Sequence, residues 1–250
     1  MKYLSTVASI AFFLTTATFA FEYDEARAEA ENGDMIAQYH LGVRYANGDG
    51  VEKDTSMAAV WYRKAAEQGL AEAQYNLGYI YLMGDGVEKD MNEAFEWYLK
   101  SAEAGLADSQ FNIALMYKQG DGVGEDIEKA IDWAKRAAEQ GHLNSQRNLG
   151  AWYGRGSEGV EVDDEEAFKW YLMAAKQGYE SSTIIVGGRY LYGSGVDKDL
   201  VRAYAWLSAS DSEMARGYLE HARKQMSESQ IDQAQVYLAT CFKSNYQDCN

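Results

Sequence analysis

The sequence predicts an all-α solenoid built from five copies of a two-helix unit. Tryptophan recurs in steps of 36, 36, 37 and 36 residues, and glycine recurs in the same phase. The tryptophans are Trp61, Trp97, Trp133, Trp170 and Trp206, and the glycines are Gly50, Gly86, Gly122, Gly159 and Gly195. The 250 residues contain no proline, and regular glycines in a proline-free chain are typical of helices separated by glycine turns.

The first helix of each unit is predicted from residues spaced three and four apart, which share one helical face. These are Leu41, Gly42 and Tyr45, recurring as Leu77, Gly78 and Tyr81 and as Leu149, Gly150 and Tyr153. A glycine inside a helix costs about 1 kcal/mol relative to alanine, so we expect a neighbouring helix to approach closely there. Turns such as Gly84 to Val87 follow, because glycine permits a left-handed backbone.

The second helix of each unit is predicted to begin at an aspartate whose carboxylate accepts the free amides of the first turn. These aspartates are Asp54, Asp90, Asp126, Asp163 and Asp199. A second glycine series suits left-handed C-caps, at Gly69, Gly105, Gly141 and Gly178. The five units are therefore predicted at residues 34–69, 70–105, 106–141, 142–178 and 179–210.

The two ends of the chain lie outside the repeat. Residues 1–20 have the features of a signal peptide, with Lys2 before an apolar run and a cut after Ala20, so we expect a periplasmic or secreted protein. Residues 21–33 are predicted to form an N-terminal capping helix, and residues 211–250 a C-terminal helical cap. Ser227 and Gln230 are expected to form a capping box there.

Both cysteines, Cys241 and Cys249, lie in this C-terminal cap. In an oxidising compartment they are expected to form a disulfide, with two free thiols as the alternative. On one continuous helix they would be separated by about 12 Å, which is too far for a disulfide. We therefore expect the last helix to end near Lys243 to Asn245, so that the chain folds back.

The chain is strongly acidic, with 23 Lys and Arg against 39 Asp and Glu and a net charge of −16. Such a surface repels phosphate and anionic lipid, so neither nucleic acid nor stable membrane insertion of the mature chain is expected. A basic partner surface is compatible with this charge, and the alternative is that the charge serves only solubility.

No catalytic set is recognisable in the sequence, and no enzyme, cofactor or metal site is expected. The three histidines, His40, His142 and His221, fall at different phases of the repeat and lack ligand spacing. The Gly-Asp-Gly turns lack the order of oxygen ligands in a calcium-binding EF-hand loop, so they are interpreted as backbone turns.

These residues together resemble the Sel1-like repeat family, a relative of the tetratricopeptide repeat. The resemblance rests on Ala73 to Gly78, Gly84 to Val87, Ala94, Trp97-Tyr98 and Gly105, and on their in-phase copies over most of residues 21–240. It implies a right-handed superhelix with a concave binding face. It also implies the roles of adaptor, sensor regulator, envelope assembly factor, host-interaction factor or immunity protein. The cysteine-rich branch that binds penicillin-type compounds fits poorly, because the repeats contain no cysteine.

In solenoids of this kind the first helices line the concave wall, and the positions that do not pack predict a partner site. These candidates are Tyr39, Tyr75, Tyr79, Met83, Phe111, Arg147 and Arg155. Aromatic side chains with a polar tip suit a peptide or helix partner, and two arginines suit a carboxylate. The alternative is that Tyr39, Tyr75 and Phe111 pack between adjacent units.

The function predicted from these features is that of an exported, non-enzymatic adaptor or regulator that binds a segment of an envelope or secreted protein on its concave face. One alternative is an immunity protein that neutralises a secreted toxin. A second alternative, from a different class, is a hydrolase of cell-wall or β-lactam compounds.

Overall fold

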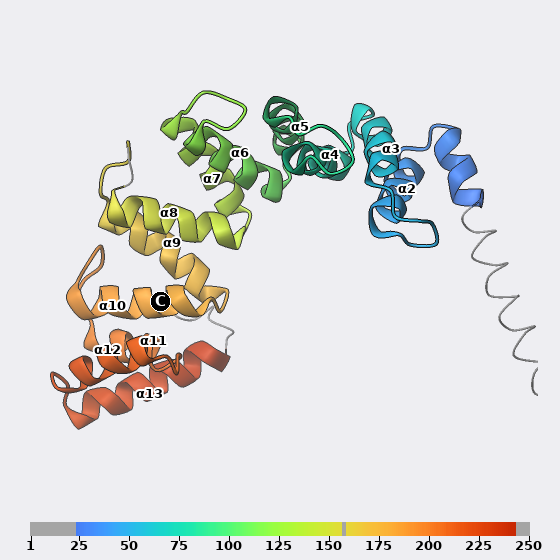
Figure 1. Cartoon of the computed structure of the whole chain (residues 1–250). Helices are drawn as coiled ribbons and strands as arrows, with labels where there is room; N and C mark the ends of the chain where they lie inside the picture. The colour runs from blue at the N-terminus through green and yellow to red at the C-terminus, as the bar shows by residue number, and fades with distance from the viewer. Residues whose placement is uncertain (1–23, 157–158, 244–250) are drawn as a thin grey trace, which may run out of the picture. The chain divides into compact units, whose positions relative to one another are not determined.

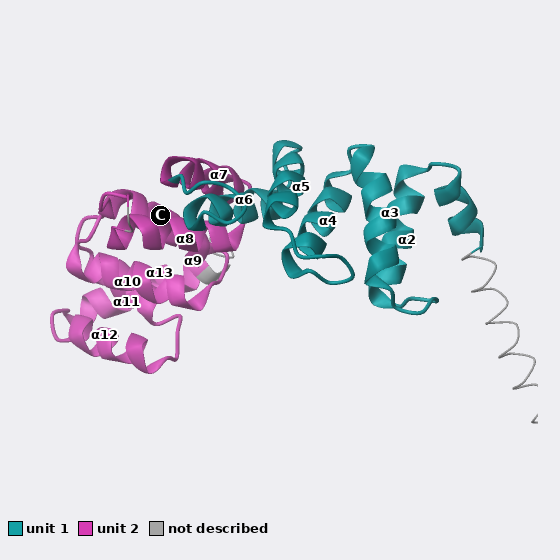
Figure 2. Cartoon of the chain, turned by 45° about the horizontal axis from the view of Figure 1, so that its top comes forward, with its two compact units in different colours: residues 1–126 teal, residues 127–250 magenta. Residues whose placement is uncertain are grey.

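The computed structural model describes residues 24–156 and 159–243, and within them every regular element is a helix (Figure 1). This confirms the predicted all-α class. The chain divides into two compact units, Met1–Asp126 and Ile127–Asn250, called unit 1 and unit 2 below (Figure 2). The predicted third repeat, residues 106–141, contributes its first helix to unit 1 and its second helix to unit 2.

Unit 1 contains a short helix over residues 24–31 followed by two complete helix pairs and one further helix. The labelled helices are α2 (Met35–Asn47), α3 (Thr55–Glu67), α4 (Ala71–Met83), α5 (Met91–Glu103) and α6 (Ala107–Gln119). Within this unit α2 packs on α3 and α4 packs on α5, while α3 contacts α4 and α5 contacts α6. Each helix therefore packs on its neighbours in sequence, as a stacked repeat requires.

Unit 2 begins with a single helix, continues with two helix pairs and ends in the C-terminal helices. These are α7 (Ile127–Glu139), α8 (Leu143–Arg155), α9 (Asp164–Lys176), α10 (Glu180–Tyr192), α11 (Leu200–Leu207), α12 (Glu213–Arg223) and α13 (Glu228–Lys243). The helices α12 and α13 both pack on α11. The repeat phase is lost after α11, and these last two helices cover the end of the array.

The predicted N-caps are confirmed at Asp54, Asp90, Asp163 and Asp199. The carboxylate of Asp90, for example, accepts from the amides of Asn92 and Glu93 at 2.9 and 3.1 Å. The closing glycines have the expected positive φ, which is +98° at Gly69. These local signals were readable in the sequence because capping depends on a few neighbouring residues.

The capping box that begins α13 is also confirmed. The amide of Gln230 donates to Ser227 Oγ at 3.3 Å, and the amide of Ser227 donates to Gln230 Oε1 at 3.0 Å. The described part of this helix ends at Lys243.

Four helical glycines, Gly42, Gly78, Gly150 and Gly187, each receive a large side chain from the second helix of their own repeat. A Cβ added at Gly78 would lie 3.0 Å from the ring of Tyr98, and one at Gly150 would lie 2.9 Å from the ring of Tyr171. Both tyrosines are buried, as are four of the five repeat tryptophans: Trp61, Trp97, Trp170 and Trp206. The glycines therefore permit the close helix packing that was expected of them.

The turn glycines have a second role that their conformation alone does not reveal. A Cβ at Gly122 would lie 2.0 Å from the carbonyl oxygen of Met91, and one at Gly195 would lie 1.8 Å from that of Asp164. Each of these turns thus lies against the start of the preceding repeat's second helix. At Gly50, in the first repeat, an added Cβ would meet nothing within 4 Å.

Candidate functional site

Two of the predicted wall residues in unit 1 pack against tyrosines of their own repeats. The ring of Tyr39 on α2 lies 5.8 Å from that of Tyr62, and the ring of Tyr75 on α4 lies 5.5 Å from that of Tyr98. Both are half-buried, as is Phe111 on α6. Each of these aromatics therefore offers only part of its surface to a partner.

Tyr79 and Met83, by contrast, are exposed over 50% and 57% of their surface. They follow Tyr75 on α4 at intervals of one helical turn and extend the same face. Tyr79 also borders a cavity of about 320 Å³ between the first two repeats, which Asn47 and Asn76 line as well. The surface on α4 is therefore apolar with polar groups beside it.

In unit 2, the predicted arginines Arg147 and Arg155 both lie on α8, two helical turns apart. The guanidinium of Arg147 lies 4.4 Å from the ring centroid of Tyr179 and donates to Asn144 Oδ1 at 3.0 Å. Arg155 is exposed. Burial raises the pKa of the Tyr171 hydroxyl, and the positive charges of Arg155, Arg189 and Arg147 oppose that rise. Three guanidinium groups thus act on one buried phenol.

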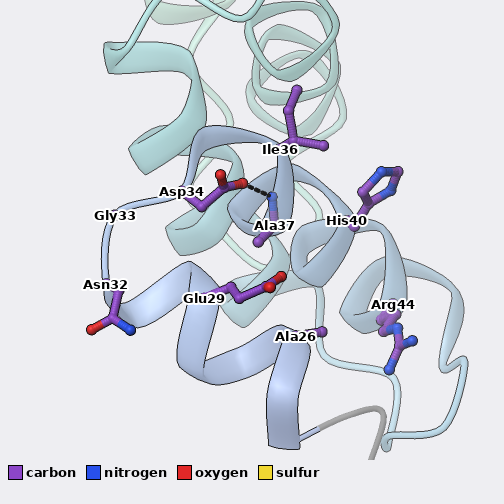
Figure 3. A pocket seen from close by; sticks show the side chains of 9 residues that line it. All are labelled: Ala26, Glu29, Asn32, Gly33, Asp34, Ile36, Ala37, His40 and Arg44. Carbon is purple, nitrogen blue, oxygen red and sulfur yellow. Dashed lines mark hydrogen bonds between the residues drawn. The ribbon is translucent and has the colours of Figure 1, made fainter.

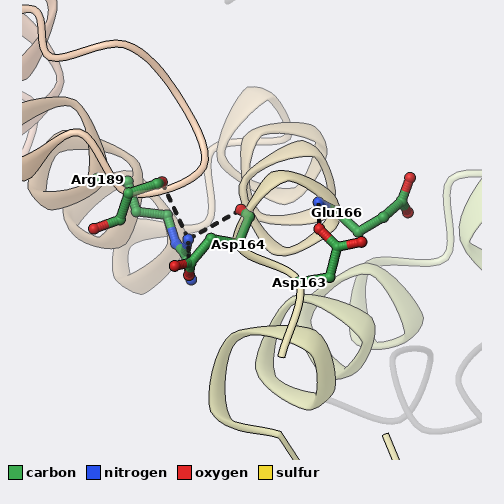
Figure 4. A network of polar contacts seen from close by, with 5 residues as sticks. Asp163, Asp164, Glu166 and Arg189 are labelled. Carbon is green, nitrogen blue, oxygen red and sulfur yellow. Dashed lines mark hydrogen bonds and ion pairs between the residues drawn. The ribbon is translucent and has the colours of Figure 1, made fainter. Parts of the chain in front are cut away.

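Arg189 on α10 belongs to this group, although its role was missed in the sequence. Its side chain is only 12% exposed, and its Nη1 donates to Asp164 Oδ1 at 2.9 Å, to the Asp164 carbonyl at 3.1 Å and to the Ser194 carbonyl at 3.2 Å (Figure 4). A Cβ at Gly154 would lie 2.7 Å from its Nη2, so the glycine in α8 leaves room for the guanidinium. The same phase is apolar at Ile80, Met116 and Trp152 but charged at Arg44, so the sequence carried little signal for this role.

Unit 2 contains a cavity of about 250 Å³ between α10 and α12. Apolar and aromatic side chains line it, including Ile184, Ile185, Tyr192, Met214 and Tyr218. The ring of Tyr192 stands edge-on to that of Tyr218 at 6.2 Å and lies 5.9 Å from the ring of His221. Arg189 and its ion-pair partner Asp164 border the same cavity, so the arginine group and the apolar pocket are adjacent.

A cavity of about 710 Å³ lies at the N-terminal end of unit 1, between the helix over residues 24–31 and α2 (Figure 3). Ala26 stands at the repeat position of Tyr62, and Glu29 stands at the position of Ala65. The equivalent cavity of the next repeat, which Tyr62 lines, is smaller, at about 320 Å³. The larger cavity follows from the end of the repeat array.

No group of three or more metal-ligating side chains occurs in residues 24–156 or 159–243. His142 instead caps α8, accepting from the Ser145 amide at 3.2 Å. None of the helices in these ranges is long and apolar enough to cross a membrane.

The predicted disulfide involves a residue outside the described part of the chain. Cys241 is 3% exposed and belongs to the core cluster around Trp206. Cys249 lies outside the described residues, so the pairing stays a prediction, as does the signal peptide over residues 1–20.

Comparison with protein families identifies the repeat. A sequence model described as "Sel1 repeat" matches residues 36–70, 71–106, 107–142, 143–179 and 185–210. Proteins of curated function give no significant match to the sequence.

Solved structures with the same fold include a Sel1 repeat protein from Oxalobacter formigenes. It is 30% identical, with a TM-score of 0.68, and the match covers 85% of this chain and 99% of that one. A protective antigen of uropathogenic Escherichia coli with an SLR fold is 24% identical, with a TM-score of 0.44 and coverage of 91% and 72%. An immunity protein from Pseudomonas aeruginosa is 21% identical, with a TM-score of 0.43 and coverage of 86% and 81%. At these lower values, the last two likenesses concern the fold alone.

Proposed function

The chain belongs to the Sel1 repeat family, whose members are scaffolds for protein–protein interaction, and on that premise we propose a specific role for it. It is an exported, non-enzymatic adaptor or regulator that binds a segment of an envelope or secreted protein on the first helices of its repeats. The export part of the proposal rests on the signal-like sequence of residues 1–20.

The observation that carries the proposal is the exposed pair Tyr79 and Met83 on α4. Large side chains of this kind are costly to leave in water, at about 25 cal/mol for each Å² of apolar surface. Single exposed apolar residues are ordinary, but these two continue one face with the half-buried Tyr75. Tyrosine and methionine are also enriched at the centres of interfaces, where an aromatic ring or a flexible thioether adapts to a partner.

The test is affinity capture with the tagged chain over residues 21–250 from envelope and culture extracts. We expect the Tyr79→Ala/Met83→Ala double variant to lose at least about tenfold of the captured partner, as is typical when central anchors are truncated. A matched control is Val60→Ala/Val236→Ala, which removes two other exposed apolar side chains, on α3 and α13. This control should capture the partner as the wild type does.

Equal capture by the wild type and the Tyr79→Ala/Met83→Ala variant would contradict the assignment of the surface. Identification of the partner then distinguishes a sensor regulator or assembly factor from a protein that neutralises a toxin. Export is tested separately, by sequencing the N-terminus of the protein recovered from the periplasm or medium. Cleavage after Ala20 predicts Phe21 as its first residue.

A further inference from the structure

The two units differ in the charge that they offer to a partner. Unit 1 has 9 Lys and Arg against 21 Asp and Glu, whereas unit 2 has 14 against 18. No charged side chain occurs at the wall positions of α2, α4 and α6. These positions are Tyr39, Tyr75 and Phe111 and the residues one and two helical turns after each of them. The equivalent positions of α8 carry Arg147 and Arg155. The net negative charge of the whole chain therefore does not extend to the wall positions of α8 in unit 2.

Arg147, Arg155 and Arg189 form what we call the arginine face. Arg189 is already neutralised by Asp164, and its short contacts fix its position at the edge of the α10–α12 cavity. Arg147 is held against the ring of Tyr179 by stacking, while the exposed Arg155 follows two turns later. An arginine that stacks on an aromatic ring keeps its outer N–H groups available for a carboxylate.

The pocket beside this face exists because the fifth repeat lacks a side chain at one wall position. Gly188 stands where the earlier repeats have Val43, Tyr79, Leu115 and Ala151. An added Cβ there would meet only Tyr218, at 3.9 Å. The rims of the pocket, Tyr192 and Met214, are 58% and 64% exposed. At about 250 Å³ the pocket is smaller than ordinary small-molecule sites, which begin near about 300 Å³, so it suits one large apolar side chain.

We propose that unit 2 binds an acidic protein segment that inserts one bulky apolar side chain into the Gly188 pocket and pairs its carboxylates with Arg147 and Arg155 of the arginine face. The proposal deepens the proposed function by naming the chemistry of a bound segment. It differs from the expectation of a basic partner that the net charge supports. The charge close to the pocket, rather than the net charge of the chain, determines which segment binds, because exposed charges are screened beyond about 10 Å at ordinary ionic strength.

The probe is a fluorescein-labelled heptapeptide with a central phenylalanine and three acidic residues on each side, titrated with the chain over residues 21–250 and followed by anisotropy. Two matched peptides replace the phenylalanine by alanine or the acidic residues by lysine. We expect the acidic phenylalanine peptide to bind at least about tenfold more tightly than either matched peptide, and its affinity to fall with added salt.

Two variants locate the probe. Arg155→Ala should weaken binding by removing an exposed charge, and Gly188→Leu should weaken it by filling the pocket. Glycine is a poor helix residue, so Gly188→Leu should fold at least as well as the wild type, which far-UV circular dichroism and thermal unfolding verify. Should leucine strain the site, Gly188→Ala places a smaller obstacle in the same pocket.

The proposal is overturned if none of the peptides binds, if the lysine peptide binds as well as the acidic one, or if Gly188→Leu and Gly188→Ala both leave affinity unchanged. It is also overturned if Tyr79→Ala/Met83→Ala abolishes peptide binding, because the probe would then lie on unit 1. The capture experiment reports on Tyr79 and Met83 independently, so either proposal can fail while the other stands.

Discussion

Tyr98 in unit 1 and Tyr171 in unit 2 occupy the same position of their repeats but lie in different electrostatic surroundings. Each packs on a helical glycine, Gly78 or Gly150, and each is buried. Burial and the neighbouring Tyr75 and Tyr79 hold the pKa of Tyr98 well above its usual range. At Tyr171 the effect of burial is opposed by three arginines. The repeat therefore conserves packing, while the first-helix face sets the chemistry of each unit.

The largest loss of stability is expected from substitutions at the turn glycines, whose backbone conformation the two units share. Gly122→Ala in unit 1 and Gly195→Ala in unit 2 would place a Cβ within 2.0 and 1.8 Å of a carbonyl oxygen. We expect each to lower the free energy of unfolding by about 3 kcal/mol or more, since the strain of a left-handed alanine adds to the steric clash. Urea unfolding measures both.

Gly50→Ala is the control for these turns, because it has the same left-handed conformation, with φ of +75°, but nothing within 4 Å of an added Cβ. Only the conformational strain should remain there, at about 1 kcal/mol. Equal losses at Gly50 and Gly122 would show that docking of the turn on the preceding helix contributes nothing.

The buried tyrosines should make the fold sensitive to alkali. Burial raises the pKa of Tyr62 to about 12, and the nearby Tyr39 adds to the rise. A phenol whose folded pKa exceeds its unfolded value near 10 stabilises the fold fully below about pH 10, and this contribution is lost as the pH rises from about 10 to about 12. The loss from Tyr62 is on the order of 2 kcal/mol.

Urea unfolding between pH 8 and about pH 11.5 tests this linkage. Tyr62→Phe has no phenol to ionise, so its stability should fall less steeply above about pH 10. If wild type and variant follow parallel curves, Tyr62 does not carry the effect and the shift is wrongly attributed to it.

A smaller effect is expected at the helical glycines. Gly78→Ala and Gly150→Ala bring a Cβ to 3.0 and 2.9 Å from a tyrosine ring, so repacking should outweigh the gain in helix propensity and cost about 1–2 kcal/mol. Gly188→Ala, in open space on the same kind of helix, should instead gain about 0.5–1 kcal/mol. Thermal unfolding of the three variants measures this difference in sign.

The sequence predicted what is local and periodic in this fold. The caps at Asp90 and Asp163 and the close approach at Gly78 follow from residues that recur in phase, so one repeat predicts the next. The exposure of Tyr79, Met83 and Arg155 could also be predicted, because helical periodicity indicates which side chains of a first helix face outward.

Contacts between non-equivalent elements could not be predicted in this way. The Gly188 pocket depends on α12, which lies outside the repeat phase, and no period places Tyr218 opposite Gly188. The guanidinium of Arg189 lies against Gly154, a residue of the preceding repeat that leaves room for it. Such pairs depend on how two different helices pack, and a single sequence does not contain that information.

The smallest expected effect concerns the difference in electrostatic surroundings between Tyr98 and Tyr171. Arg155 is the charge that most opposes the effect of burial on Tyr171, so Arg155→Ala should raise the pKa of that phenol further while leaving Tyr98 unchanged. Titration of tyrosines labelled with ¹³C at Cζ, followed by NMR, reports each phenol separately, and Tyr171→Phe assigns its signal. Because Arg155 is exposed, added salt should reduce its influence, so the wild-type pKa should also rise in salt. A Tyr171 signal that moves with neither the substitution nor salt would mean that the arginine face does not act on this phenol. The two units would then differ in residue type but not in the electrostatic potential at their buried tyrosines.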